Sequence, residues 1–185
     1  MGCPTRRSRG LPSGAGSVAA FRTAAQVKLG RYRTRMVQKE IIQKSRILIV
    51  DDEPANVLLL ERILQQGGYT DLRKTTDPRQ VLEFFTVYQP DLILLDLMMP
   101  QVDGYSLLTQ LRSRIPDNHY LPILVLTADV APKAKRQAFS LGAKDFLTKP
   151  FDATEVLLRV YNLLETRWLS VQLHEQIKAL ENPSP

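Results

Sequence analysis

The sequence predicts an α/β protein built on a doubly wound, five-stranded parallel sheet. Short apolar runs alternate with helical patterns along residues 46–165. Several of these runs are apolar on both faces, as in a parallel sheet that helices cover on both sides. Right-handed crossovers between parallel strands leave a doubly wound sheet as the natural closure of five such units. Its common strand order is 2-1-3-4-5.

Each expected strand is short, and most end at a polar residue. The first run, RILIV, stops at Asp51 and Asp52, and the third stops at Asp96. The second run, DLRKTT, is more polar than the others, which places it at or near an edge of the sheet. The five expected strands span residues 46–50, 71–76, 91–96, 121–127 and 144–148.

Proline and glycine mark the expected helices. Pro54 and Pro78 stand at helix starts, and the pair Gly67-Gly68 ends the first apolar stripe. The expected helices cover 57–64 with a start near Pro54, a stretch after Pro78, 105–112, 132–142, and a long last helix from near Asp152.

A basic segment precedes the predicted domain. Residues 1–39 hold nine Arg and Lys residues and no acid, so the rest of the chain carries 16 basic and 19 acidic residues. The overall charge of +6 is therefore no sign of nucleic-acid binding. We expect a disordered extension at 1–43, a domain at 44–165 and a helical extension at 166–185. An organelle transit peptide or a twin-arginine signal at Thr5-Arg6-Arg7 stays open for the basic segment.

Composition also indicates the cellular compartment of the protein. No stretch approaches the roughly 18 apolar residues needed to cross a bilayer. The single cysteine, Cys3, excludes an internal disulfide and fits a reducing compartment. We therefore expect a soluble, cytoplasmic protein with no membrane partner.

Polar residues gather at one predicted edge of the sheet. In this fold, ligands bind at the carboxyl ends of the strands, beside the switch point between strands 1 and 3. Asp51, Asp52 and Asp96 would meet there, and each pair of carboxylates about 5 Å apart repels by roughly 3 kcal/mol. A divalent cation such as Mg²⁺ would offset that repulsion. Thr127 and Lys149 end the next two strands, which completes a cradle for a phosphoryl group on Asp96.

Each of these residues has an ordinary explanation when taken alone. Asp51 and Asp52 could form a solvated loop pair or a helix cap. Thr127 could be a strand-end hydroxyl, Lys149 a surface charge, and Phe146 a core residue. Their joint arrival at one sheet edge favours a phosphoacceptor site.

Four motifs resemble the receiver domain of two-component response regulators, the CheY-like family: VDDEP at 50–54, LLDLMMPQVDG at 94–104, LTA at 126–128 and FLTKPF at 146–151. The resemblance implies that Asp96 accepts a phosphoryl group from a sensor histidine kinase or a phosphotransfer protein. It also implies that Asp52, Asp96 and the main-chain carbonyl of Met98 bind Mg²⁺, with Asp51 acting through a bound water.

The resemblance assigns a switch as well. Lys149, before a cis peptide bond to Pro150, would pair with Asp96 and then with the phosphoryl oxygens. Thr127 would move towards the phosphoryl group, and Phe146 would swing inward, changing the face made by the helix at 132–142, the strand at 144–148 and the last helix. Ala128 and Asp129 would lie at the site entrance, and we expect the charge of Asp129 to alter the lifetime of the phosphorylated form.

The last helix carries a heptad-like stripe that continues beyond the expected domain. The stripe runs through Leu157, Tyr161, Leu164, Trp168 and Val171, then shifts to Leu173, Ile177 and Leu180. The early positions could simply pack on the sheet, whereas Trp168 and later residues are expected to pass beyond it. The last helix would then project as a signalling helix or form a homodimer. The tail is too short for a DNA-binding domain. It resembles the connector of regulators with a downstream enzymatic domain, such as a cyclic-dinucleotide phosphodiesterase, which would be absent from this chain.

Two other functions compete with a phosphorylation switch that is not itself an enzyme. One is a receiver-like scaffold that ignores phosphate, although it would not need the full set of site residues. The other is an aspartyl-phosphate phosphatase, which would need a second acid two residues after Asp96, where this chain has Met98.

Overall fold

The computed structural model describes residues 36–100, 102–129 and 131–181. The chain divides into two units, Met1–Lys39 and Glu40–Pro185, and the second contains the fold. Its five strands form one parallel sheet in the order β2-β1-β3-β4-β5, which confirms the predicted order. The strands are β1 (Ile47–Val50), β2 (Leu72–Thr75), β3 (Leu92–Asp96), β4 (Ile123–Thr127) and β5 (Asp145–Thr148).

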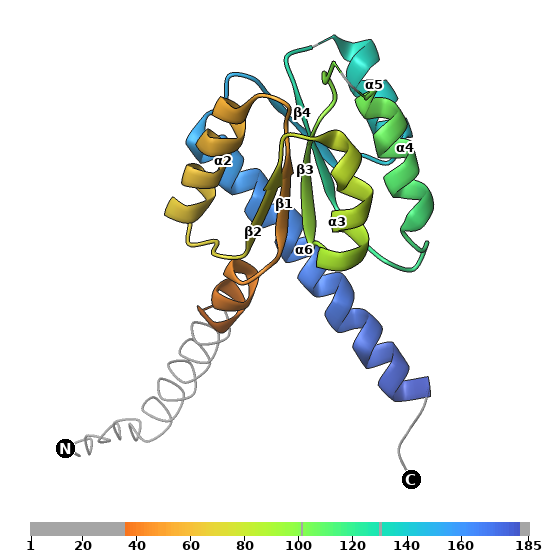
Figure 1. Cartoon of the computed structure of the whole chain (residues 1–185). Coiled ribbons are helices and arrows are strands. Elements are labelled where there is room, and N and C mark those ends of the chain that lie inside the picture. The colour runs from red at the N-terminus through yellow and green to blue at the C-terminus, as the bar shows by residue number, and fades with distance from the viewer. Residues whose placement is uncertain (1–35, 101, 130, 182–185) are drawn as a thin grey trace, which may run out of the picture. The chain divides into compact units, whose positions relative to one another are not determined.

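Helices cover both faces of the sheet (Figure 1). Buried residues of α2 and α6 form one apolar cluster with one face of the sheet. Residues of α3, α4 and α5 form a second cluster with the other face. The helices are α2 (Pro54–Gln66), α3 (Val81–Tyr88), α4 (Gly104–Arg114), α5 (Pro132–Ser140) and α6 (Ala153–Glu181), and a 3₁₀ turn, η1 (Pro78–Gln80), precedes α3.

The apolar runs form the centre of the sheet because both of their faces are covered. Every residue of β1, β3 and β4 is buried. Strand β2 lies at one edge and exposes Arg73 and Lys74, as its polar sequence predicts. The helix starts also agree with the predictions: Pro54 and Pro132 occupy first turns, where a missing N–H costs nothing.

The start of the described chain corrects one expectation. Residues 36–43 are helical, although disorder was predicted through residue 43, and Gln43 donates from Nε2 to the Gly67 carbonyl at 2.7 Å. The rest of the basic segment, including Cys3 and the possible targeting signals, lies outside the described residues.

Helix α6 runs without a break across the predicted boundary at residue 165. Trp168, which was expected to pass beyond the sheet, still packs against the core cluster of α2 and α6. The apolar side chains that remain exposed near the end of α6 are Leu169, Leu173, Ile177 and Leu180. Within the described residues, no helix has the length and apolar content to cross a membrane.

Candidate functional site

The register of the two central strands brings three carboxylates together. Val50 pairs with Leu95, so the residues that follow, Asp51 and Asp96, are neighbours at the carboxyl edge of the sheet. Oxygen atoms of Asp51, Asp52 and Asp96 all lie within 4.8 Å of one another. Asp51 and Asp96 are fully buried, and Asp52 is partly buried. The convergence predicted from the strand ends is therefore present in the structure.

Asp51 is held by the start of α2 through one carboxylate oxygen and by an ion pair with Lys149 through the other. Its Oδ1 accepts hydrogen bonds from the Glu53 backbone N–H at 3.1 Å and from Asn56 Nδ2 at 3.0 Å. Its Oδ2 lies 2.8 Å from Lys149 Nζ, an ion-pair distance without the geometry of a hydrogen bond. This oxygen is thus a buried acceptor with no hydrogen bond among the described residues. Asn56 was not singled out from the sequence, where it is one polar residue in an amphipathic helix.

Lys149 provides the positive charge of the site. It follows β5 and is joined to Pro150 by the expected cis peptide bond. Its Nζ donates to Asp96 Oδ2 at 2.6 Å, and its side chain is 20% exposed. Burial lowers the pKa of Lys149, but the carboxylates of Asp51 and Asp96 outweigh burial and raise that pKa above its usual value. Lys149 therefore stays protonated and leaves the four groups with two excess negative charges.

The excess negative charge affects the titration of Asp52, the third carboxylate of the site. Its pKa lies above the ordinary value, first because of burial and then because of the neighbouring charges of Asp96 and Asp51. Three converging carboxylates with hard oxygen ligands and excess negative charge fit a small divalent cation. Mg²⁺ bound there would neutralise charge on the carboxylates.

The loop after β3 holds Asp96 and Met98 in place. Asp96 Oδ1 accepts a hydrogen bond from the Met98 backbone N–H at 3.0 Å, and Met98 forms a β-bridge with Asp103. Asp103 also caps α4 through hydrogen bonds from two backbone N–H groups. A Cβ on Gly104 would lie 2.4 Å from Leu97 Cα, so only glycine fits this close approach. The side chain of Met98 is exposed, whereas its backbone N–H contacts Asp96.

Thr127 is buried at the end of β4 and is bonded to the loop that follows. Its Oγ1 accepts from the Asp129 N–H at 2.9 Å and donates to the Asp129 carbonyl at 3.3 Å. Asp129 Oδ1 accepts in turn from the Ala131 N–H at 2.7 Å, ahead of α5. Within the described residues Thr127 makes no hydrogen bond to Asp96. Ala128 and Asp129 are exposed beside the site.

Phe146 is half-buried between two cations. Lys135 Nζ lies 3.7 Å from the centre of the ring, and the guanidinium carbon of Arg159 lies 5.6 Å from it. Phe139 meets the ring edge-on, with 5.8 Å between centroids. Arg159 also binds Asp145 at 2.7 Å, which ties α6 to β5. This arrangement could not be predicted from sequence patterns, because its groups come from three separate elements, α5, β5 and α6.

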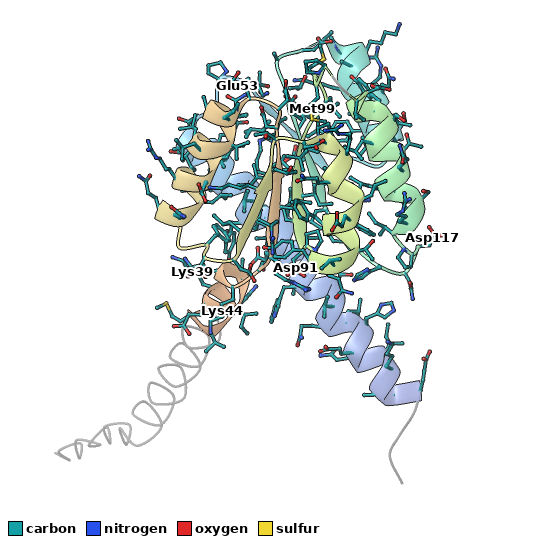
Figure 2. All side chains as sticks on the ribbon, viewed as in Figure 1. Lys39, Lys44, Glu53, Asp91, Met99 and Asp117 are labelled. Atoms are coloured by element: carbon teal, nitrogen blue, oxygen red, sulfur yellow. The ribbon has the colours of Figure 1, made fainter. Side chains whose placement is uncertain are left out.

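The site thus occupies one end of the sheet. Glu53, at the start of α2, and Met99, in the loop after β3, lie near that end, and Asp91, just before β3, lies at the opposite end (Figure 2). A five-stranded sheet of this order, with acidic side chains at its switch point and a lysine after β5, is the architecture of a receiver domain. Residues 47–161 match the response regulator receiver domain family. The chain belongs to this family of two-component signalling proteins.

Similar proteins include regulators of several kinds. The chain is 45% identical over 121 residues to the DNA-binding dual master transcriptional regulator RpaA of Synechocystis, an overlap of 64% of this chain and 48% of that protein. It is 31% identical over 128 residues to a Vibrio cholerae protein named as a probable cyclic di-GMP phosphodiesterase, covering 69% of this chain and 28% of that protein.

A solved structure matches the domain alone. The receiver domain of the Francisella response regulator 1452 is 31% identical, with a TM-score of 0.59, and the match covers 67% of this chain and 98% of that one. The chain spans about half the length, or less, of the curated relatives described above.

Proposed function

We propose that this receiver domain is a Mg²⁺-dependent phosphorylation switch with Asp96 as its phosphoacceptor. The observation that carries the proposal is the position of Asp96. Its buried carboxylate accepts a hydrogen bond from Lys149 at 2.6 Å and lies within 4.8 Å of two other carboxylates. Burying a carboxylate beside two other carboxylates costs folding free energy unless the site binds a cation. Asp52, Asp96 and the Met98 carbonyl would hold Mg²⁺, and Asp51 would contact it through water.

The reaction is a transfer from a phosphohistidine of a sensor kinase or phosphotransfer protein. A carboxylate oxygen of Asp96 attacks phosphorus and forms an O–P bond while the P–N bond to the imidazole breaks. The imidazole nitrogen keeps the electron pair and takes a proton from solvent. Lys149, freed from its pairing with Asp96, would hold a phosphoryl oxygen, so its charge favours the more negative product.

The switch would begin at Thr127. Its hydroxyl would leave the backbone of Asp129 and hydrogen-bond to the phosphoryl group. Phe146 would then move into the space that Thr127 vacates, away from Lys135 and Arg159. This movement would change the face formed by α5, β5 and α6, where a partner reads the state of the switch.

We further propose that α6 forms a homodimer. Leu169, Leu173 and Ile177 recur at four-residue intervals, and Leu180 follows after three, which places them on one side of a helix. All four are exposed, so a second copy of α6 would remove their apolar surface from water. The heptad-like pattern predicted from the sequence is therefore divided, because its positions up to Trp168 pack on the core and its last three positions are exposed. Leu169, which the predicted pattern did not include, joins the exposed stripe.

Intact-protein mass after incubation with Mg²⁺ and acetyl phosphate tests the switch. We expect the wild type to gain one phosphoryl group and Asp96→Asn to gain none. Asp117→Asn, a matched substitution on a side chain that is fully exposed, should gain the group as the wild type does. No gain by the wild type, even with a cognate kinase, would contradict the proposal and favour the phosphate-independent scaffold. Turnover of small phosphate esters would instead favour the phosphatase.

A further inference from the structure

A hollow lies at the end of the sheet opposite Asp96. Its volume is about 460 Å³, within the range of pockets that bind small molecules. Phe85, Pro90 and Leu121 supply apolar walls, and Arg46, His119 and Arg167 supply polar ones. The residues come from three separate regions of the chain, the start of β1, the end of α3 and the segment before β4, together with α6.

The charge of this hollow is unbalanced. One carboxylate, Asp91, serves both arginines: its Oδ1 accepts from Arg167 Nε at 3.1 Å, and its Oδ2 lies 3.5 Å from Arg46 Nε. Among the described residues that line the hollow, none is acidic. Two guanidinium groups therefore share one negative charge, and the surplus positive charge borders the hollow.

Both arginines also retain donors that find no acceptor among the described residues. Arg46 Nη1 donates to the Tyr88 carbonyl at 3.0 Å, and Arg167 Nη1 donates to the Tyr120 carbonyl at 2.6 Å. Among the described residues, neither Nη2 atom makes a hydrogen bond. Arg167 is only 9% exposed, so its unused donors have limited access to water. A buried guanidinium with unused donors gains from an anionic acceptor more than an exposed one does.

His119 adds a neutral group to the same wall. Its Nε2 lies 3.2 Å from Arg167 Nη1 and acts as the acceptor, since a guanidinium can only donate. Burial and then the charge of Arg167 lower the pKa of His119 below its usual value. The ring therefore leaves the surplus charge of the arginines unchanged at neutral pH.

We propose that this hollow binds a small organic anion, one that carries a carboxylate or phosphate-type group on a flat apolar body. The anionic group would accept hydrogen bonds from Nη2 of Arg46 and Arg167, and the apolar body would lie against Phe85, Pro90 and Leu121. Charge complementarity selects this ligand over a neutral one. The proposal is independent of phosphorylation at Asp96, because no residue of the hollow belongs to that site.

NMR titration of the full chain tests the proposal with benzoate and phenylphosphonate, which cannot transfer a phosphoryl group. We expect saturable amide shifts at residues 85–89 and 119–121, with dissociation constants of about 1 mM. Benzyl alcohol, of similar size and uncharged, should bind at least tenfold more weakly. Saturation by one anion alone would identify which of the two headgroups the hollow accepts.

A charge substitution at the rim provides the matched variant. Gln89 lines the hollow and is exposed, so Gln89→Glu keeps the shape of the side chain while placing a carboxylate beside the arginines. We expect at least tenfold weaker binding of both anions, and unchanged binding in Gln110→Glu, an exposed position of α4 outside the hollow. Equal binding of benzyl alcohol, full affinity in Gln89→Glu, or no saturable shifts with either anion would overturn the proposal.

Discussion

Replacing Asp52 by asparagine should stabilise the protein in the absence of divalent cations. Asp52 is the most exposed of the three carboxylates, and oxygen atoms of all three lie within 4.8 Å of one another. At an effective dielectric of about 20, a pair of charges at that distance repels by about 3 kcal/mol. Solvent at the partly exposed Asp52 screens this repulsion, and we expect a net gain of about 1–2 kcal/mol in the free energy of unfolding.

Urea denaturation with and without Mg²⁺ measures both consequences of this substitution. Without Mg²⁺, the midpoint of Asp52→Asn should exceed that of the wild type by roughly 0.5–1 M urea. Adding Mg²⁺ at ten times its dissociation constant should stabilise the wild type by about 1.4 kcal/mol, and the variant much less. Asp117→Asn should match the wild type both in its midpoint without Mg²⁺ and in its stabilisation by Mg²⁺. A less stable Asp52→Asn protein, or equal Mg²⁺ stabilisation of both, would refute the reasoning.

The pH dependence of this difference has a defined sign. The pKa of Asp52 in the folded protein lies above its ordinary value of 3.8. Its protonated form is therefore favoured by folding, and the wild type loses stability as pH rises from 3.8 through the folded-state pKa. The advantage of Asp52→Asn should be full at neutral pH and should shrink as pH falls towards 3.8.

Three other substitutions test neighbouring parts of the site. Gly104→Ala should cost about 1–3 kcal/mol in urea denaturation, because its Cβ would lie 2.4 Å from Leu97 Cα; unchanged stability would contradict that contact. Lys135→Met removes a cation 3.7 Å from the Phe146 ring, a contact worth about 0.5–1 kcal/mol, and should speed phosphorylation by acetyl phosphate up to fivefold. An identical rate would show that Lys135 does not hold the ring in its present position. Asp129→Ala should change the dephosphorylation rate, and an unchanged rate would refute a role for its charge.

The sheet and the position of its acidic edge could be predicted because both depend on local pattern. Apolar runs such as LILLD, between helical stretches, specify buried parallel strands, and the topology then determines which strand ends meet. Asp51 and Asp96 needed only this topology to be placed together. Their neighbour Asn56 could not be identified, since a polar residue in the first turns of a helix has many ordinary partners.

Contacts between elements far apart along the chain could not be predicted from the sequence. Arg167 binds Asp91, which lies 76 residues earlier in the chain. The heptad-like pattern of α6 does not single out Arg167. The same pattern made Trp168 look free of the sheet, although the ring packs on the core. Periodicity identifies which side of a helix is apolar, but it does not identify which neighbour covers that side. The position where α6 leaves the sheet therefore had to come from the structure.

The unbroken course of α6 gives the domain a lever arm. Its 29 residues make a rod about 43 Å long. Arg167 anchors the rod near its middle, and Glu181 lies 14 residues beyond, about 21 Å away. A tilt of about 3° around that anchor would move the far end by roughly 1 Å, since a straight helix transmits rotation along its length. Small repacking at Phe146 and Arg159 would thus be magnified into a displacement at the exposed leucines.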